Sequence, residues 1–120
     1  MIVLLGSNGY VGKAFSRHLE ASSIAYIACS RAEIDYSSKR GLTQLLLRHK
    51  PDFVVNCAGY TGKPNVDACE FDKGNCLDGN SVLPGVIRDV CEELGITWGH
   101  VSSGCIFSGE RPGGGGWKEE

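Results

Sequence analysis

Short, continuous apolar runs recur along the chain and are separated by amphipathic segments. The runs at 2–5, 24–29 and 53–55 are rich in branched residues and have the length of buried strands in a parallel sheet. The run at 96–101 predicts a further strand, and 33–35 is a candidate for a short one. The pattern therefore predicts up to five strands, most of them separated by helices.

Apolar residues in the intervening segments recur at the spacing of one face of a helix. The first helix presents Val11, Phe15 and Leu19 and ends before Ser22. The second follows a cap at Ser37 or Ser38 and ends at Lys50, before Pro51; its apolar face consists of Leu42, Leu45 and Leu46.

The second half of the chain predicts a long loop and a long helix. Residues 58–73 are rich in Gly, Pro, Asn and Asp and predict the loop, and the helix follows over 75–94. Pro84 and Gly85 lie inside that helix, so we expect a kink or a break there, and Gly95 ends it.

Strands that alternate with helices in this way indicate an α/β fold. We expect a Rossmann-type doubly wound parallel sheet with strand order 3-2-1-4-5 and helices on both faces. A ligand of such a sheet lies across the carboxyl ends of the strands, where the strand order reverses. The 120 residues are enough for one domain, 1–120.

Composition and charge argue against two classes of partner, nucleic acids and membranes. The net charge of −2 provides no basic field for a nucleic acid, and no apolar stretch approaches the ~20 residues of a membrane span. The amino terminus lacks the basic region of a signal peptide. We expect a cytoplasmic protein whose six cysteines stay reduced, because they lie mostly in or beside apolar runs and form no C-x-x-C pair. We expect no zinc site, because the histidines show no zinc-ligand spacing to the cysteines.

The most informative motif follows the first strand, where Gly6, Gly9 and Gly12 are spaced G-x-x-G-x-x-G. Gly6 permits a tight turn, Gly9 permits backbone to approach a pyrophosphate, and Gly12 permits the helix to pack on the strand. The N–H groups of the first helical turn then face the anion. The motif predicts dinucleotide binding; the alternative is a tight turn without a ligand.

The end of the second strand indicates which dinucleotide binds. An acidic residue there favours NAD, whereas this chain has Ser30 and Arg31. A guanidinium suits a 2′-phosphate, so we expect NADP(H) in preference to NAD(H). The alternative is that Arg31 is a solvated loop residue and that Glu33 binds the ribose.

Two further motifs follow later strands. Small residues in Asn56-Cys-Ala-Gly59 would let backbone lie against the ribose and nicotinamide of the cofactor. A hydroxyl in Ser102-Ser103-Gly104 could donate a hydrogen bond to a substrate carbonyl as its oxygen gains negative charge. Each motif is also compatible with a plain turn.

Together these motifs resemble the extended short-chain dehydrogenase/reductases. Within them the chain is similar to the dTDP-4-dehydrorhamnose reductases and, through 61–70, 104–107 and 116–120, to the epimerase/reductase domain of plant nucleotide-rhamnose synthases. The resemblance implies reduction of the C4 ketone of a nucleotide-linked 4-keto-6-deoxy sugar in rhamnose-type synthesis, with Ser103 as the catalytic residue that binds the substrate carbonyl. It implies cofactor binding by Gly6, Ser7, Asn8, Gly9, Tyr10, Val11, Gly12, Ser30, Arg31, Asp35, Tyr36, Ala58, Gly59, Tyr60, Thr61 and Asn80.

The chain departs from this family in one respect. The family uses a Tyr-x-x-x-Lys pair as general acid, and none of the four tyrosines here has a lysine four residues later. We therefore expect an amino-terminal part of a longer enzyme, inactive alone, without the substrate domain. Alternatives are a non-catalytic regulatory subunit, like the β subunit of methionine adenosyltransferase, or a nucleotide-sugar epimerase or dehydratase. The sequence leaves a homodimer open, and an exposed edge at the fifth strand would promote self-association.

Overall fold

Ten elements make up the fold in the computed structural model, which describes residues 1–63, 65–102 and 111–115. In chain order they are β1 (Ile2–Leu5), α1 (Tyr10–Ala21), β2 (Tyr26–Cys29), α2 (Lys39–His49), β3 (Phe53–Asn56), the 3₁₀ helix η1 (Val66–Phe71), α3 (Lys73–Leu77), the π-helical turn η2 (Asp78–Val82), α4 (Leu83–Leu94) and β4 (Thr97–His100).

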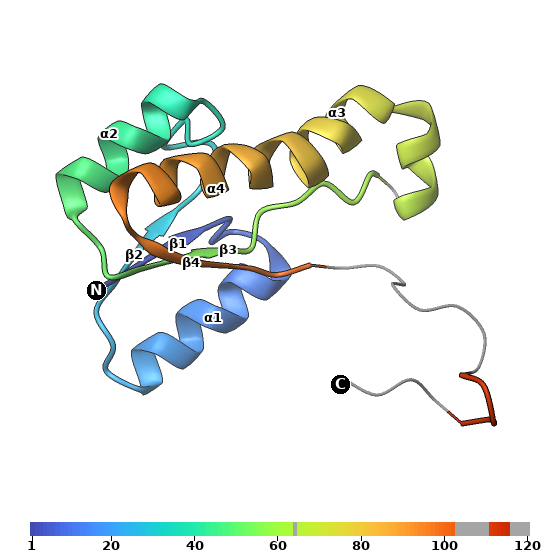
Figure 1. Cartoon of the computed structure of the whole chain (residues 1–120), viewed down its shortest axis with the longest axis horizontal. Helices are drawn as coiled ribbons and strands as arrows, with labels where there is room; N and C mark the ends of the chain where they lie inside the picture. Colours follow the sequence, from blue (N-terminus) through green and yellow to red (C-terminus); the bar gives the residue numbers. More distant parts are fainter. Residues whose placement is uncertain (64, 103–110, 116–120) are drawn as a thin grey trace.

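The strands form one parallel sheet in the order β2-β1-β3-β4. Their register places Cys29, Leu5, Asn56 and His100 in one row, so all four strands end at the same edge. Helix α1 covers one face of the sheet, whereas α2 and α4 cover the other (Figure 1). This arrangement confirms the expected α/β, Rossmann-type architecture.

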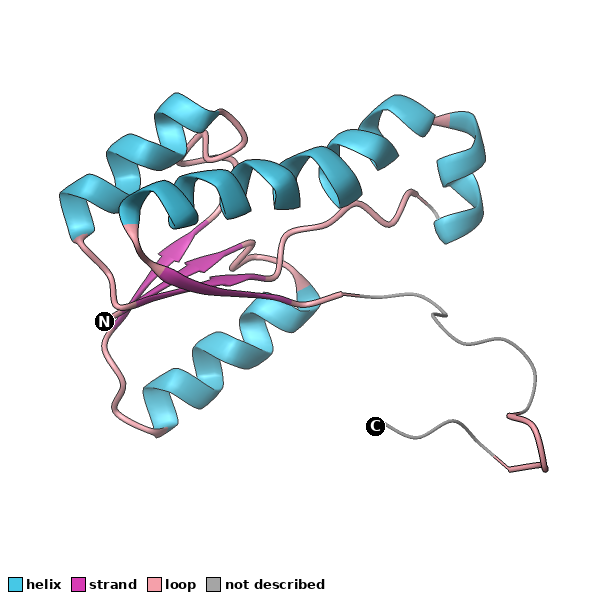
Figure 2. Ribbon diagram, in the orientation of Figure 1, coloured by secondary structure: helices cyan, strands magenta, loops and turns pink. Residues whose placement is uncertain are grey.

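The main core lies between the sheet and the α2–α4 layer (Figure 2). Alternate residues of the strands, Val3, Leu5 and Val54, meet the apolar faces of the two helices, and all three are completely buried. The helix residues opposite them include the predicted leucines of α2 and four residues of α4: Leu42, Leu45, Leu46, Leu83, Ile87, Val90 and Cys91. On the other face, Leu4 is completely buried and Leu19 of α1 is 4% exposed.

The prediction of a short strand at 33–35 is wrong. The carbonyl of Ser30 accepts hydrogen bonds from the N–H groups of Glu33 (3.2 Å) and Ile34 (3.1 Å), which turns the chain away from the sheet. Asp35 Oδ1 then accepts from the N–H of Ser37 at 3.2 Å. These local bonds compete with strand pairing, so β2 is an edge strand and the expected order 3-2-1-4-5 holds only for its last four strands.

The predicted helix over 75–94 is interrupted, as expected near Pro84, but the break precedes the proline. Pro84 has no N–H to donate four residues back, and the N–H of Leu83 bonds to Asp78 five residues back. The chain therefore makes the π-helical turn η2 between α3 and α4. The predicted loop at 58–73 also contains η1, which the Gly- and Asn-rich composition did not reveal.

Candidate functional site: a cavity at the carboxyl ends of the strands

A cavity of about 280 Å³ opens at the carboxyl ends of β1, β2 and β3. The chain runs from β1 through α1 to β2 on one side and then crosses back through α2 to β3 on the other side of β1, so the cavity lies at the point where the strand order reverses. Its lining comes from the three segments that follow these strands: Gly6, Asn8, Gly9, Ser30, Arg31, Ala32, Tyr36, Cys57, Ala58 and Gly59. Eight of these ten residues are ones that the sequence predicted for cofactor binding.

The glycine turn is closed by contacts between main-chain atoms. Gly6 has a φ of +77°, and a Cβ placed on it would lie 2.5 Å from the nitrogen of Ala58. A Cβ on Gly12 would lie 2.1 Å from the carbonyl oxygen of Gly6. Both positions therefore need glycine for packing, whereas a Cβ on Gly9 would meet only that same oxygen, at 3.4 Å. Gly9 keeps open space on the side where a ligand would approach.

The amino terminus of α1 lies next to this cavity. Gly9 is its N-cap residue, no side chain caps the helix, and its first turn contains no acidic residue. The first N–H groups of a helix have no partner within the helix, so these groups are available to an anion. Of the other predicted residues here, Ser7 is 8% exposed, and the side chains of Asn8, Tyr10 and Val11 are exposed.

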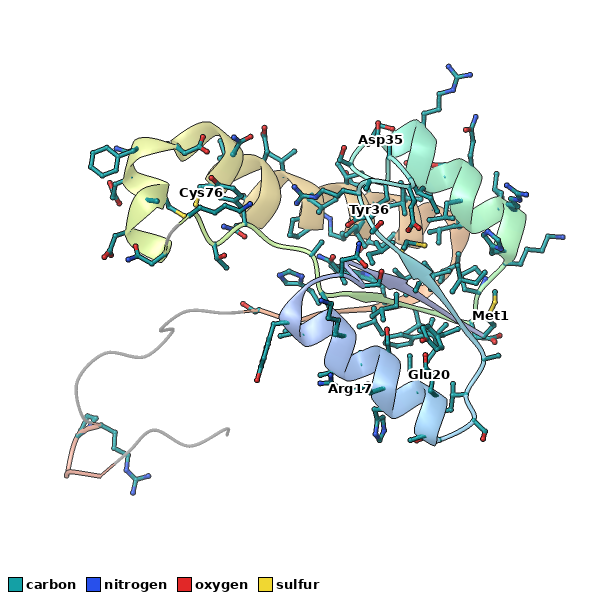
Figure 3. All side chains as sticks on the ribbon, turned by 180° about the vertical axis from the view of Figure 1, so that it is seen from behind. Met1, Arg17, Glu20, Asp35, Tyr36 and Cys76 are labelled. Atoms are coloured by element: carbon teal, nitrogen blue, oxygen red, sulfur yellow. The ribbon has the colours of Figure 1, made fainter. Side chains whose placement is uncertain are left out.

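Arg31 and Tyr36 meet on the β2 side of the cavity. Tyr36 is 1% exposed and belongs to the buried core (Figure 3), and Arg31 and Tyr36 both line the cavity. Burial raises the pKa of Tyr36, and the positive charge of Arg31 partly opposes that shift. Arg31 thus contributes a positive charge to the cavity wall, next to Tyr36.

Two other predicted residues on this side bond to neighbours in their own loop. The Ser30 hydroxyl donates to the Glu33 carboxylate at 2.7 Å. Asp35 lies outside the cavity lining and accepts from the Ser37 hydroxyl at 2.5 Å, and the bonds from Ser37 lower the pKa of the Asp35 carboxyl. Glu33, the alternative ribose ligand, is therefore already engaged by Ser30.

The carboxyl ends of β3 and β4 are joined by a side-chain bond that the sequence analysis missed. Asn56 is completely buried; its Oδ1 accepts from the N–H of Ala58 at 3.0 Å, and its Nδ2 lies 2.9 Å from Nδ1 of His100. Because the amide nitrogen can only donate, Nδ1 of His100 is the acceptor and carries no hydrogen. The pair fixes Ala58, which packs against Gly6. The pairing depends on the register of β3 and β4, which the sequence does not display.

Asn80 holds the segment that follows β3. Its Oδ1 accepts from the N–H of Tyr60 at 2.9 Å, and its Nδ2 donates to the Tyr60 carbonyl at 2.7 Å. A Cβ on the adjacent Gly79 would lie 2.8 Å from Cβ of Tyr60 and 3.5 Å from a guanidinium nitrogen of Arg31. The π-helical turn thus brings Asn80, Tyr60 and Arg31 together, although they are far apart in the sequence.

The remaining predicted residues lie at the edges of this region. Gly59 lines the cavity, and Thr61 is exposed in the loop beyond it. Ser102 follows β4 and is exposed, whereas the predicted catalytic residue Ser103 lies outside the described residues. No cluster of three or more potential metal ligands occurs within the described ranges.

Comparison with known proteins identifies the family of the chain. The sequence matches the family described as RmlD substrate binding domain over residues 1–120. The chain belongs to this family. It is 34% identical to the bifunctional dTDP-4-dehydrorhamnose 3,5-epimerase/dTDP-4-dehydrorhamnose reductase of Arabidopsis thaliana, over 98% of this chain and 40% of the plant protein. It is 26% identical to the dTDP-4-dehydrorhamnose reductase of Streptomyces griseus, over 92% of this chain and 36% of that protein.

Solved structures share the fold. The UDP-rhamnose synthase of Acanthamoeba polyphaga mimivirus superposes with a TM-score of 0.82 at 21% identity, over 90% of this chain and 38% of that one. The dTDP-4-dehydrorhamnose reductase of Bacillus anthracis, solved in complex with NADP, superposes with a TM-score of 0.71 at 18% identity, over 81% of this chain and 34% of that one. This chain thus spans well under half the length of each of these relatives. Among its described residues, no helix has the length and apolarity required to cross a membrane.

Proposed function

We propose that this RmlD-family chain is the dinucleotide-binding part of a longer nucleotide-sugar oxidoreductase. The observation that carries the proposal is the uncapped amino terminus of α1 opening into the cavity beside the tightly closed Gly6–Gly12 turn. The reductases and rhamnose synthases among its relatives support the assignment, and they do not favour a non-catalytic regulatory subunit. The partial coverage of those relatives supports a substrate domain outside 1–120.

The residues present fit a dinucleotide. The glycine turn and the first turn of α1 would hold the pyrophosphate, because unpaired N–H groups and the helix dipole favour an anion. Arg31, Ser30 and Tyr36 would bind the adenosine half, and Ala58, Gly59 and Tyr60 the nicotinamide half. Asn80 would position Tyr60 through the two bonds to its main chain.

We assign NADP(H) in preference to NAD(H). Arg31 lines the cavity together with Tyr36, and its guanidinium can there form charge-assisted bonds to a 2′-phosphate. Glu33, which would favour a free ribose hydroxyl, accepts a bond from Ser30 instead. When bound, the reduced dinucleotide supplies a hydride.

The substrate is proposed to be an NDP-4-keto-6-deoxy sugar, reduced at C4. Ser103 would donate a hydrogen bond to the C4 oxygen as negative charge develops on it, because it follows the strand β4 that ends at the cavity edge. In the whole enzyme, Ser103→Ala should lower turnover strongly and leave the dinucleotide affinity nearly unchanged.

Calorimetric titration of the chain with NADPH and NADH tests the cofactor assignment. We expect tighter binding of NADPH, and a loss of about tenfold in its affinity in Arg31→Ala, which corresponds to ~1.4 kcal/mol. The matched control is Arg17→Ala, which removes an exposed arginine of α1 from outside the cavity lining. Equal affinities for NADPH and NADH, unchanged in Arg31→Ala, would contradict the role of Arg31.

A further inference from the structure

Two cysteines flank Asp72 in the segment that follows β3. Cys69 belongs to η1 and Cys76 to α3. The N–H of Asp72 donates to the carbonyl of Cys69 at 3.2 Å, and the N–H of Cys76 donates to the carbonyl of Asp72 at 3.1 Å. Both cysteines are therefore held by main-chain bonds to the same residue, on the two sides of one turn.

The two thiols act on one another, because Cys76 raises the pKa of the Cys69 thiol. Both cysteines are free and partly exposed. Cys76 lies in the helical region distant from the α2 end of the molecule (Figure 3). A reagent in solution can therefore reach this pair.

The pair is joined to the predicted nicotinamide side of the cavity by side-chain bonds. Asn80 Nδ2 donates to Sγ of Cys76 at 3.4 Å and to the carbonyl of Tyr60 at 2.7 Å. The hydroxyl of Tyr60 donates to Asp72 at 2.6 Å, and Asn75 Nδ2 donates to the same carboxylate oxygen at 3.0 Å. Asn80 therefore bonds to both Cys76 and Tyr60, and Asp72, whose carbonyl accepts from the Cys76 N–H, bonds to the Tyr60 hydroxyl.

We propose that Cys69 and Cys76 are a thiol modification site that forms a reversible disulfide with a low-molecular-weight disulfide, such as oxidised glutathione, as oxidant. One cysteine thiolate attacks the sulfur–sulfur bond of the reagent, forming a mixed disulfide and releasing one reagent thiol. The second cysteine thiolate displaces the other reagent thiol. Overall, two cysteine thiols lose two electrons and two protons, and the reagent is reduced to two thiols.

The local charges predict how the rate depends on pH. The neighbouring thiol of Cys76 and the carboxylates of Asp72 and Glu70 raise the pKa of the Cys69 thiol. Because the thiolate is the attacking species, disulfide formation should accelerate as the pH rises above neutrality. Cys29 and Cys91 are completely buried, and burial raises the pKa of each thiol to about 11, so they should not compete.

The consequence for binding rests on the proposed function. Disulfide sulfurs are about 2.05 Å apart, closer than two unbonded thiols can approach, so the bond must draw α3 and η1 together. Helix α3 continues directly into η2, which carries Asn80, and so Tyr60 should shift with it. We expect the oxidised chain to bind NADPH about fivefold more weakly than the reduced chain.

Peptide mapping after equilibration with reduced and oxidised glutathione tests the disulfide without reference to binding. Trypsin cuts after Lys73, so the disulfide should link peptide 49–73 to peptide 74–88. The linked pair should disappear in Cys69→Ser and in Cys76→Ser and persist in Cys57→Ser, which removes the other cysteine of the first peptide. Free thiols at both positions throughout, or a linked pair that persists in Cys69→Ser, would overturn the proposal.

Titration with NADPH then separates this proposal from the proposed function. Oxidation should weaken binding by the wild-type chain and leave the affinity of Cys69→Ser unchanged. Identical affinities of the oxidised and reduced wild type would overturn the coupling between the pair and the cavity. Failure of the reduced chain to bind any dinucleotide would contradict the proposed function, while the linked peptides would still support the modification site.

Discussion

The two walls of the cavity are built differently. The glycine turn after β1 is closed by main-chain atoms, with Gly6 and Gly12 too near other backbone to accept a Cβ. The segment from Ala58 to Val82 is held by side chains, chiefly those of Asn56 and Asn80. The first wall should be rigid and intolerant of substitution, whereas the second should shift when one of the side chains that hold it is replaced or modified. Replacing one residue at a time in each wall measures this difference.

The largest expected effect is at Gly12. Its added Cβ would lie 2.1 Å from the Gly6 carbonyl oxygen, and backbone on both sides leaves little room for relaxation. Gly12→Ala should lower the free energy of unfolding by about 3 kcal/mol, measured by urea denaturation. Gly85→Ala is the matched control, because nothing lies within 4 Å of its added Cβ. That control should stabilise α4 by about 0.5–1 kcal/mol. Equal losses in both variants would contradict the close packing of the turn.

A smaller loss of stability is expected at Asn56. Asn56→Ala leaves the N–H of Ala58 without its partner in a buried environment and removes the donor that faces His100. The free energy of unfolding should fall by about 2 kcal/mol. Asn75→Ala, which removes an exposed amide bonded to Asp72, should change it by less than about 0.5 kcal/mol. A loss at Asn75 as large as that at Asn56 would argue against a special role for the buried amide.

Asn80 should affect binding more than stability, because its side chain is exposed. Asn80→Ala removes both bonds to the Tyr60 main chain and should raise the Kd for NADPH about fivefold, with only a small change in Tm. Asn80→Asp keeps the acceptor for the Tyr60 N–H and should have an intermediate Kd. Calorimetry on the three proteins measures this order, and an unchanged Kd in Asn80→Ala would remove Asn80 from the binding site.

The last expected effect is confined to alkaline pH and concerns the buried cysteines. Folding raises the pKa of Cys29 and Cys91 from 9.0 to about 11, so between these values the unfolded chain has lost protons that the folded chain still holds. The stabilisation is fully present below pH 9 and is lost as the pH rises toward 11. Urea denaturation at intervals across this pH range should show the free energy of unfolding decline as the pH rises. The decline per pH unit should be smaller in Cys91→Ala. The same pH dependence of stability in Cys91→Ala and in the wild type would contradict the attribution of this decline to the buried thiols.

Sequence reasoning predicted the main-chain wall far better than the side-chain wall. Strand length, glycine spacing and helical periodicity are local signals, and they located β1, α1 and the turn between them. The prediction of a strand at 33–35 failed because hydrogen bonds accepted by the Ser30 carbonyl and the Asp35 carboxylate competed with the strand pairing that the apolar pattern alone favoured. The contact of Asn80 with Tyr60 depends on a π-helical turn, and the His100 bond on strand register, neither of which a single sequence displays.

The central claim is that a dinucleotide binds at the carboxyl ends of β1, β2 and β3. It is tested most directly by amide NMR spectra of the isotopically labelled chain during titration with NADPH. The account predicts the largest shifts at the N–H groups around the cavity: Gly6, Gly9, Tyr10, Arg31, Ala58 and Gly59. Shifts concentrated instead in the hollow between the ends of α2 and α4, at Leu47, Lys50 and Gly95, would contradict it.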